Sequence, residues 1–161
     1  MALQNDLDLL LSVDLFQGFP EEQLRLLAFG TERELLRAGR ELFRLGDASN
    51  GGYVIAGGQI DMIMFRGHRE IILDSGYQGG LIGELGLITQ AIRSTNAVAR
   101  TNSEVMFIPR TLFHRMLNTY PESAAILHQR ISLSVHRMLE QLHALRDSID
   151  AAPKFQTPKP R

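Results

Sequence analysis

Glu84 and Arg93 are two charged residues whose surroundings and spacing could bind a small molecule. Glu84 lies in Gly83-Glu84-Leu85-Gly86-Leu87, which has the length and composition of a single helical turn. The N-terminus of such a turn presents unpaired N–H groups, and glycines allow close approach to the backbone. Arg93 follows nine residues after Glu84, and its planar guanidinium group can bind two phosphate oxygens at once. The spacing therefore predicts an anion site.

The carboxylate of Glu84 makes a sugar phosphate the best fit to this site. A carboxylate repels a phosphate, so we expect Glu84 to accept a hydrogen bond from a hydroxyl group of the same ligand. Ser94 adds a hydroxyl for the phosphate or for a base edge, and apolar strand residues would cover a flat base. One alternative stays open here: Glu84 and Arg93 could form an ion pair that closes a loop without a ligand.

Catalytic and metal-binding patterns are weak by comparison. The chain has no cysteine, which excludes disulfides, thiol nucleophiles and thiolate metal sites. His136, Glu140 and His143 share one face of a predicted helix, but a second histidine at i+4 is missing. Ser94 has no neighbouring histidine to act as a base. We expect no metal site and no enzyme activity; a barrel hydrolase or metal-dependent oxygenase is the least favoured alternative.

Length, composition and charge indicate one globular domain. The 161 residues are 44% hydrophobic and 22% charged, with a formal net charge of -1. Both lysines lie in the last nine residues, and the preceding chain has no basic cluster, so we expect no nucleic-acid binding. The chain lacks an apolar run of membrane-spanning length, and its N-terminus is acidic. We therefore expect a soluble, cytoplasmic protein without a membrane partner.

Glycine and proline divide the chain into a β-rich middle and helical ends. Residues 46–86 contain 11 of the 14 glycines and no proline. The β-branched and aromatic residues between these glycines predict short strands joined by tight turns. Turns or bulges are predicted at Gly51-Gly52 and Gly57-Gly58. We expect the β region to cover residues 31–110, with Arg93 at the start of a strand over residues 93–100.

Helical patterns flank the β region. Leucines recur at helical spacing within residues 1–30, where a proline followed by two glutamates marks the start of a helix. Residues 111–150 are predicted to form a short helix and then a long one. Apolar residues repeat at intervals of three and four over residues 124–149, so this stripe either packs on its own domain or pairs with a second copy in a homodimer. Prolines in residues 151–161 predict a disordered tail.

The motif around Glu84 resembles the phosphate-binding cassette of cyclic nucleotide-binding domains, the group that includes Crp/Fnr-like sensory domains. The family pattern is Phe-Gly-Glu-Leu-Ala-Leu, a spacer, then Pro-Arg and a small residue. The resemblance extends from about Leu9 to Leu142 and includes LFQGFPEEQLRLLA, the turn Gly46-Asp47 and YVIAGGQIDM. It implies a mainly β fold over residues 1–150: an eight-stranded antiparallel jelly-roll barrel with N-terminal helices and a long C-terminal helix, here without a helix-turn-helix module.

The resemblance also implies a role for each cassette residue. Arg93 would bind the cyclic phosphate, Glu84 the ribose 2′-hydroxyl, and backbone amides would complete the cradle. The predicted site consists of Gly83, Glu84, Leu85, Gly86, Arg93, Ser94 and Thr95. The expected ligand is cAMP or else cGMP, with no further cofactor, and the C-terminal helix would transmit binding as a lid. The alternative is an interaction or dimerisation module on the same fold that uses no nucleotide.

The cassette departs from the family pattern at several positions. Ile82 replaces the usual aromatic residue, and Gly86 replaces alanine, which we expect to loosen the short helix by under ~1 kcal/mol. Ile92 replaces the proline before the arginine and leaves that loop less fixed. Thr95 and Asn96 stand at the family's Ala-Thr positions, which leaves the base preference open. Both charged residues of the cassette are kept, so we expect it to be competent to bind.

Overall fold

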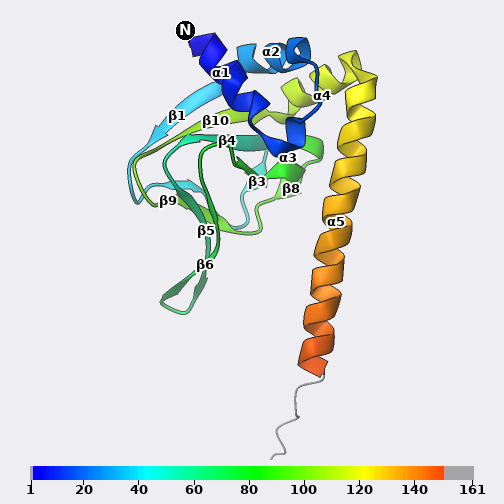
Figure 1. Ribbon diagram of the computed structural model, residues 1–161. Helices are drawn as coiled ribbons and strands as arrows, with labels where there is room; N and C mark the ends of the chain where they lie inside the picture. The colour runs from blue at the N-terminus through cyan, green and yellow to red at the C-terminus, as the bar shows by residue number, and fades with distance from the viewer. Residues whose placement is uncertain (1, 151–161) are drawn as a thin grey trace, which may run out of the picture. The chain divides into compact units, whose positions relative to one another are not determined.

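The computed structural model describes residues 2–150, and the predicted tail, residues 151–161, lies outside the described residues (Figure 1). The helices are α1 (Ala2–Leu11), the 3-10 helix η1 (Asp14–Phe16), α2 (Glu21–Phe29), α3 (Glu84–Ile88), α4 (Arg110–Thr119) and α5 (Pro121–Asp150). The strands are β1 (Glu32–Leu36), β2 (Glu41–Phe43), β3 (Ala48–Ser49), β4 (Gly51–Gly57), β5 (Ile60–Arg66), β6 (Arg69–Gly76), β7 (Leu81–Ile82), β8 (Ala91–Ile92), β9 (Asn96–Ala99) and β10 (Ser103–Pro109).

The strands form antiparallel sheets, as predicted. Two sheets have four strands each, in the orders β1-β10-β4-β7 and β2-β9-β5-β6, and the third pairs β3 with β8. An apolar core joins the two large sheets; its buried members are Leu36, Ile55, Ile60, Ile82, Ala97, Ala99 and Val105. The predicted barrel is not closed by the strand pairing within residues 2–150, because β3, β7 and β8 have two residues each and cannot carry a ladder around the ends of the sheets.

One predicted turn is a strand. Gly51 and Gly52 begin β4 and pair with Pro109 and Ile108 of β10. A Cβ atom on Gly51 would lie 2.1 Å from the carbonyl oxygen of Ile108. Glycine therefore serves close strand packing here, not a reversal of the chain. The other predicted position does turn: Gly58, between β4 and β5, has a positive φ of 84°.

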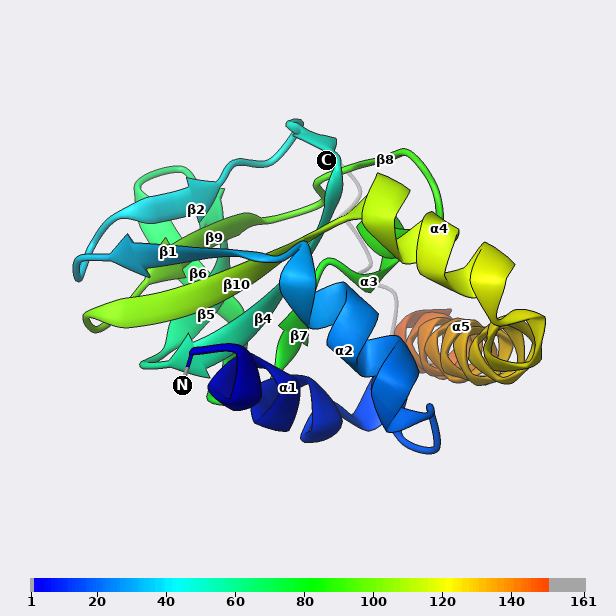
Figure 2. The same cartoon turned by 90° about the horizontal axis from the view of Figure 1, so that it is seen from above.

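Helices α1, α2 and α4 lie over one end of the two large sheets (Figure 2). Their packing is apolar: Leu24 and Leu27 of α2 are fully buried, and the rings of Phe16 and Phe113 have centroids 6.1 Å apart. The Ser123 hydroxyl donates a 2.5 Å hydrogen bond to Oε1 of Gln23, and both side chains are buried. The flanking helices predicted from the leucine spacing are thus present.

The long helix α5 spans Pro121–Asp150, close to its predicted bounds. The chain divides into two compact units, residues 1–124 and 125–161, so the boundary falls within this helix. Most side chains of the predicted dimer stripe lie outside the described set: Ile131, Val135, Met138, Leu142, Leu145 and Ile149. A homodimer through residues 124–149 therefore stays a prediction. None of the described helices is long and apolar enough to span a membrane.

The histidine and glutamate pair of α5 is exposed. Nε2 of His136 lies 3.2 Å from Oε1 of Glu140, and both side chains are about two-thirds or more exposed, at 71% and 67%. No cluster of three side chains able to hold a metal ion occurs among the described residues.

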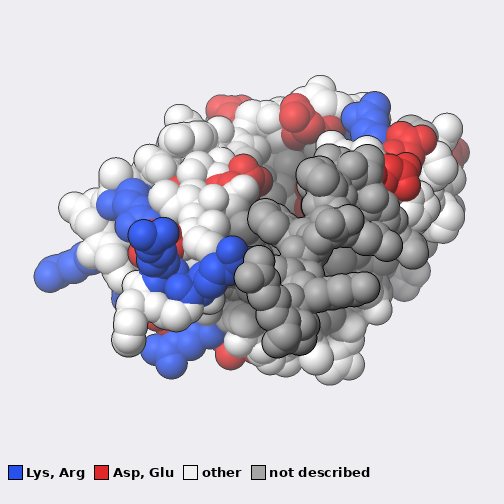
Figure 3. All heavy atoms as spheres, turned by 90° about the horizontal axis from the view of Figure 1, so that it is seen from below, with Lys and Arg blue, Asp and Glu red and all other residues white. Residues whose placement is uncertain are grey.

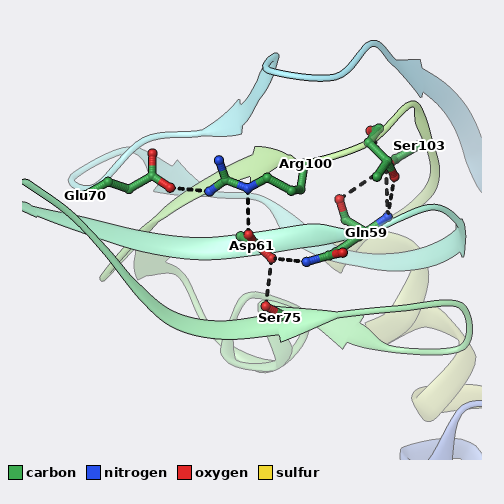
Figure 4. A network of polar contacts seen from close by, with 7 residues as sticks. Gln59, Asp61, Glu70, Ser75, Arg100 and Ser103 are labelled. Atoms are coloured by element: carbon green, nitrogen blue, oxygen red, sulfur yellow. Dashed lines mark hydrogen bonds and ion pairs between the residues drawn. The ribbon is translucent and has the colours of Figure 1, made fainter.

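A buried carboxylate ties the second large sheet together (Figure 4). Asp61 of β5 is 1% exposed and accepts hydrogen bonds from Nε2 of Gln59 (2.9 Å), Oγ of Ser75 (2.7 Å) and Nε of Arg100 (2.8 Å). Arg100 also forms an ion pair with Glu70 of β6. Burial alone would raise the pKa of Asp61, but its hydrogen bonds and Arg100 hold that pKa below the ordinary value.

We predict that Asp61→Asn lowers the free energy of unfolding at neutral pH by about 1–3 kcal/mol. A carboxyl group whose pKa is lowered by folding stabilises the protein above its unfolded pKa, and that contribution is lost as pH falls through the folded pKa. The variant should therefore lose less stability in acid than the wild type, as measured by urea unfolding over a pH series. Glu70→Gln, which changes the exposed partner of Arg100, should have a much smaller effect. An unchanged acid dependence in Asp61→Asn would contradict this assignment.

Candidate ligand-binding site

The predicted helical turn is present as α3, and Gly83 is its N-cap residue. Gly83 has a φ of 77°, in the left-handed region, and follows directly on β7. A Cβ atom at this position would lie 2.1 Å from Nη1 of Arg93. Glycine is therefore required twice, once for the backbone conformation and once because the guanidinium group occupies the space of a side chain.

Arg93 lies between two strands, so the strand predicted over residues 93–100 is present only as β9 and its predicted start at Arg93 is wrong. The structure has β8 at Ala91–Ile92 and β9 at Asn96–Ala99, with irregular backbone between them. The Arg93 N–H donates to the carbonyl of Asp47, and the Arg93 carbonyl accepts from the N–H of Gly46, both at 2.8 Å. These bonds to the Gly46-Asp47 turn replace the sheet ladder and fix the backbone of the arginine.

The side chain of Arg93 points into the protein. It is 8% exposed, and its Nη2 donates a 3.1 Å hydrogen bond to the carbonyl of Gly51. Its guanidinium carbon lies 4.3 Å from the ring centroid of Phe43 and 5.6 Å from that of Tyr53. Burial lowers the pKa of Arg93, while Tyr53 and Asp47 act in the opposite direction. This cation is thus desolvated and held mainly by aromatic faces and one carbonyl.

Within residues 2–150, Arg93 forms no ion pair. By contrast, several other arginines pair with acidic residues, among them Arg25, Arg33, Arg40, Arg44 and Arg100. Figure 3 shows basic side chains gathered over one part of the lower surface, with acidic side chains among and beside them.

The Gln23 Nε2 is the one fully enclosed side-chain nitrogen or oxygen without a hydrogen-bond partner in the described part of the chain. The N–H groups of Arg93 that have no protein acceptor are therefore not fully enclosed.

Glu84, the other charged residue of the cassette, is exposed and does not pair with Arg93. The alternative of a loop-closing ion pair between these two residues is therefore wrong for the described structure. Crowding of the carboxyl group by protein atoms raises the pKa of Glu84 above its ordinary value. A nearby guanidinium group would have lowered it.

The other predicted site residues fall into two groups. Leu85 and Gly86 follow Glu84 on α3, so the structure brings this turn together with Arg93 beside Gly83. Ser94 and Thr95 continue the irregular segment after Arg93, with Ser94 exposed and Thr95 half-buried. The side chain of Asn96 is engaged in the fold, because its Oδ1 accepts the N–H of Leu45 at 2.9 Å.

The sequence analysis does not identify the aromatic partners of Arg93. Phe43 and Tyr53 are 50 and 40 positions earlier in the chain, in β2 and β4. Tyr53 belongs to the segment YVIAGGQIDM, which contributes to the family resemblance but gives Tyr53 no role at the site. No local signal marks either ring as a contact of an arginine; only the pairing of distant strands brings them there.

Gly86 has a packing reason to differ from the family's alanine. A Cβ atom there would lie 1.9 Å from Oγ of Ser49 and 2.4 Å from the carbonyl oxygen of Gly51. Ser49 is 1% exposed, and its hydroxyl already donates to the same Gly51 carbonyl at 3.1 Å. The backbone of α3 therefore lies directly against the chain that also receives the hydrogen bond of Arg93.

Comparison with known proteins agrees with this geometry. A domain model described as "Cyclic nucleotide-binding domain" matches residues 33–120. The structure of a cyclic nucleotide-binding-like protein from Brucella abortus is 43% identical and has a TM-score of 0.64, covering 71% of this chain and 98% of that chain. The catabolite activator protein of Thermus thermophilus is 26% identical with a TM-score of 0.71, covering 82% and 62%.

A further solved structure and the curated relatives extend this comparison. The N-terminal domain of a transcriptional regulator from Streptomyces coelicolor is 25% identical with a TM-score of 0.71, covering 94% of this chain and 100% of that chain. The neuropathy target esterase sws of Drosophila mojavensis is 27% identical over 76% of this chain. The chain spans 8% of the length of that relative.

We predict that Gly86→Ala lowers the free energy of unfolding by about 1–3 kcal/mol, because an added methyl group would overpack against Ser49 and the Gly51 carbonyl. Chemical denaturation followed by circular dichroism measures this loss. Gly57→Ala is the matched control: a Cβ atom there meets no atom within 4 Å, so the change should stay within about 0.5 kcal/mol. Equal stability of Gly86→Ala and wild type would show that this contact yields easily.

Proposed function

The chain belongs to the cyclic nucleotide-binding domain family, and on this premise we propose that it is a regulatory module that binds a cyclic nucleotide, cAMP or cGMP, at the cassette. The observation that carries the proposal is the buried guanidinium group of Arg93, which faces a left-handed glycine and has no carboxylate partner among the described residues. A desolvated cation of this kind gains more from an anion than an exposed one does. A cyclic phosphate supplies one negative charge and two free oxygens for the guanidinium fork.

Glu84 supports a sugar on the same ligand. Its carboxylate is exposed and unpaired within the described structure, on the first residue of α3. An ionised carboxylate accepts a hydrogen bond but cannot donate one, so a hydroxyl group is the partner that suits it. In our proposal Arg93 binds the phosphate, Glu84 accepts a hydrogen bond from the ribose 2′-hydroxyl, and the amides of Gly83 and Leu85 face the phosphate oxygens, with Ser94 and Thr95 at the rim. The Gly86 amide donates to the Gly83 carbonyl at 3.0 Å, so Gly86 contributes by its close packing.

The cassette is connected to the helices that follow the sheets. Nη1 of Arg110, at the start of α4, donates to the carbonyls of Ser49 at 2.8 Å and Thr89 at 3.3 Å. The ring nitrogen Nε2 of His114 lies 2.9 Å from the carbonyl oxygen of Ile88, the last residue of α3. We propose that ligand binding is transmitted through these contacts to α4 and on to the C-terminal helix α5. The ligand can shift this equilibrium only by its difference in affinity for the two states.

Arg93→Ala should weaken cAMP binding by about 2–5 kcal/mol, since it removes the cation from a desolvated pair. Isothermal titration calorimetry on the full chain measures the change. Arg44→Ala is the matched control, because that side chain is 73% exposed and pairs with Glu41; its affinity should stay close to that of the wild type. No heat and no rise in melting temperature with millimolar cAMP or cGMP would reject the proposal in favour of an interaction or dimerisation module.

Affinity for cAMP should fall in acid because of Glu84. Protonation removes the acceptor charge, so binding weakens as pH falls through the pKa of this group, which lies above the ordinary 4.5. Calorimetry over a descending pH series, as far as the protein stays folded, tests this. Glu84→Gln should bind more weakly at neutral pH and lose the acid dependence, and 2′-deoxy-cAMP should show none of this dependence with the wild type. The same acid profile in Glu84→Gln would remove Glu84 from the site.

A further inference from the structure

Arg93 lies on a pair of aromatic rings where the two large sheets meet. Phe43 ends β2 of one sheet, and Tyr53 lies in β4 of the other. The two rings have centroids 6.2 Å apart, and Tyr53 continues to Phe107 at 5.1 Å. The guanidinium carbon is within cation–π range of both, with Phe43 the nearer at 4.3 Å.

Backbone contacts alone do not orient this side chain. The bonds to Gly46 and Asp47 fix the main chain of Arg93, but four rotatable side-chain bonds separate it from the guanidinium group. One hydrogen bond, to the Gly51 carbonyl, holds an edge of that group, and no carboxylate among the described residues holds another. Burial opposes the charged state of Arg93, as its lowered pKa reflects. A long charged side chain in this position would gain hydration by turning outward unless another contact opposed that movement.

Phe43 opposes this outward movement of the Arg93 side chain and leaves free the N–H donors that would bind an anion. A ring attracts the flat face of a guanidinium group, whereas the N–H donors lie in its plane and point outward from the rim. The guanidinium carbon lies over the Phe43 ring, so this contact holds the cation inside without using the donors that an anion needs. The left-handed Gly83 leaves room on the other side, since a Cβ atom there would collide with Nη1.

We propose that Phe43 is a positioning residue of the anion site: its ring holds the Arg93 guanidinium group, in the free protein, in the orientation that meets the ligand. This inference rests on the proposed function, because the ligand is taken to be a cyclic nucleotide. Pre-orientation raises affinity by removing the cost of ordering the arginine when the ligand arrives. Tyr53, at 5.6 Å, plays the lesser part.

The binding test compares Phe43→Leu with the same substitution at Phe107, whose ring contacts Tyr53. Phe43→Leu should lower cAMP affinity about three- to thirty-fold, the range that corresponds to one cation–π contact. Phe43→Tyr keeps a ring and should restore affinity to near the wild-type value. Phe107→Leu makes the same substitution on the ring that contacts Tyr53, so it should leave affinity nearly unchanged. Equal losses in Phe43→Leu and Phe107→Leu would overturn the proposal, because they would show a general packing effect.

A second measurement needs no ligand. The side-chain Nε–Hε resonance of Arg93, assigned by its loss in Arg93→Lys, should be shifted upfield by the ring current of Phe43 in the free wild-type protein. The shift should disappear in Phe43→Leu and persist in Phe107→Leu. A wild-type resonance at the position of a solvated arginine would overturn the proposal even if Phe43→Leu failed to fold. If the shift is present and no cyclic nucleotide binds, the proposed function fails while the positioning of Arg93 by Phe43 stands.

Discussion

The buried guanidinium group of Arg93, which pairs with no carboxylate among the described residues, is the constraint around which this domain is arranged. Removing a guanidinium group from water costs free energy that an ion pair usually recovers in part. Here part of the recovery comes from an aromatic face and one backbone carbonyl, and in our proposal an anionic ligand supplies the rest. The residues that surround Arg93 come from both large sheets and from the turn at Gly46-Asp47. The arginine can therefore take this position only after the strands have paired.

The glycines near the site follow from the same constraint. Gly51 offers its carbonyl to both Arg93 and Ser49, and it lies so close to β10 that no side chain would fit. Gly86 packs on that same stretch of backbone, and Gly83 leaves its side-chain volume to the guanidinium group. These three positions keep backbone close to backbone and to the guanidinium group, while the rings of Phe43 and Tyr53 supply the side-chain contacts of the cation. The many glycines of residues 46–86 therefore reflect close packing of backbone segments as well as turns of the chain.

The features that sequence could predict are the local ones. The helical turn at Glu84, the flanking helices and the antiparallel β region follow from residue types and spacing within short windows. The continuous strand over residues 93–100 was predicted wrongly because the backbone of Arg93 pairs with Gly46 and Asp47, about 46 positions earlier. The turn at Gly51-Gly52 failed for a related reason: its role is set by β10, which is distant in sequence. Phe43 was missed because only strand pairing brings it beneath the arginine.

The two pKa shifts have the directions expected of charged residues that do not pair with each other. An ion pair between Glu84 and Arg93 would lower the pKa of the carboxyl group and raise that of the guanidinium group. Instead, the pKa of Glu84 is raised and that of Arg93 is lowered, so neither group is held in its charged form by the other. Each group is therefore left with a charge that its surroundings do not satisfy, and the two need different partners: an anion for Arg93 and a hydrogen-bond donor for Glu84. A molecule that carries a phosphate and a hydroxyl on one rigid ring satisfies both at once, whereas a simple anion satisfies only the first.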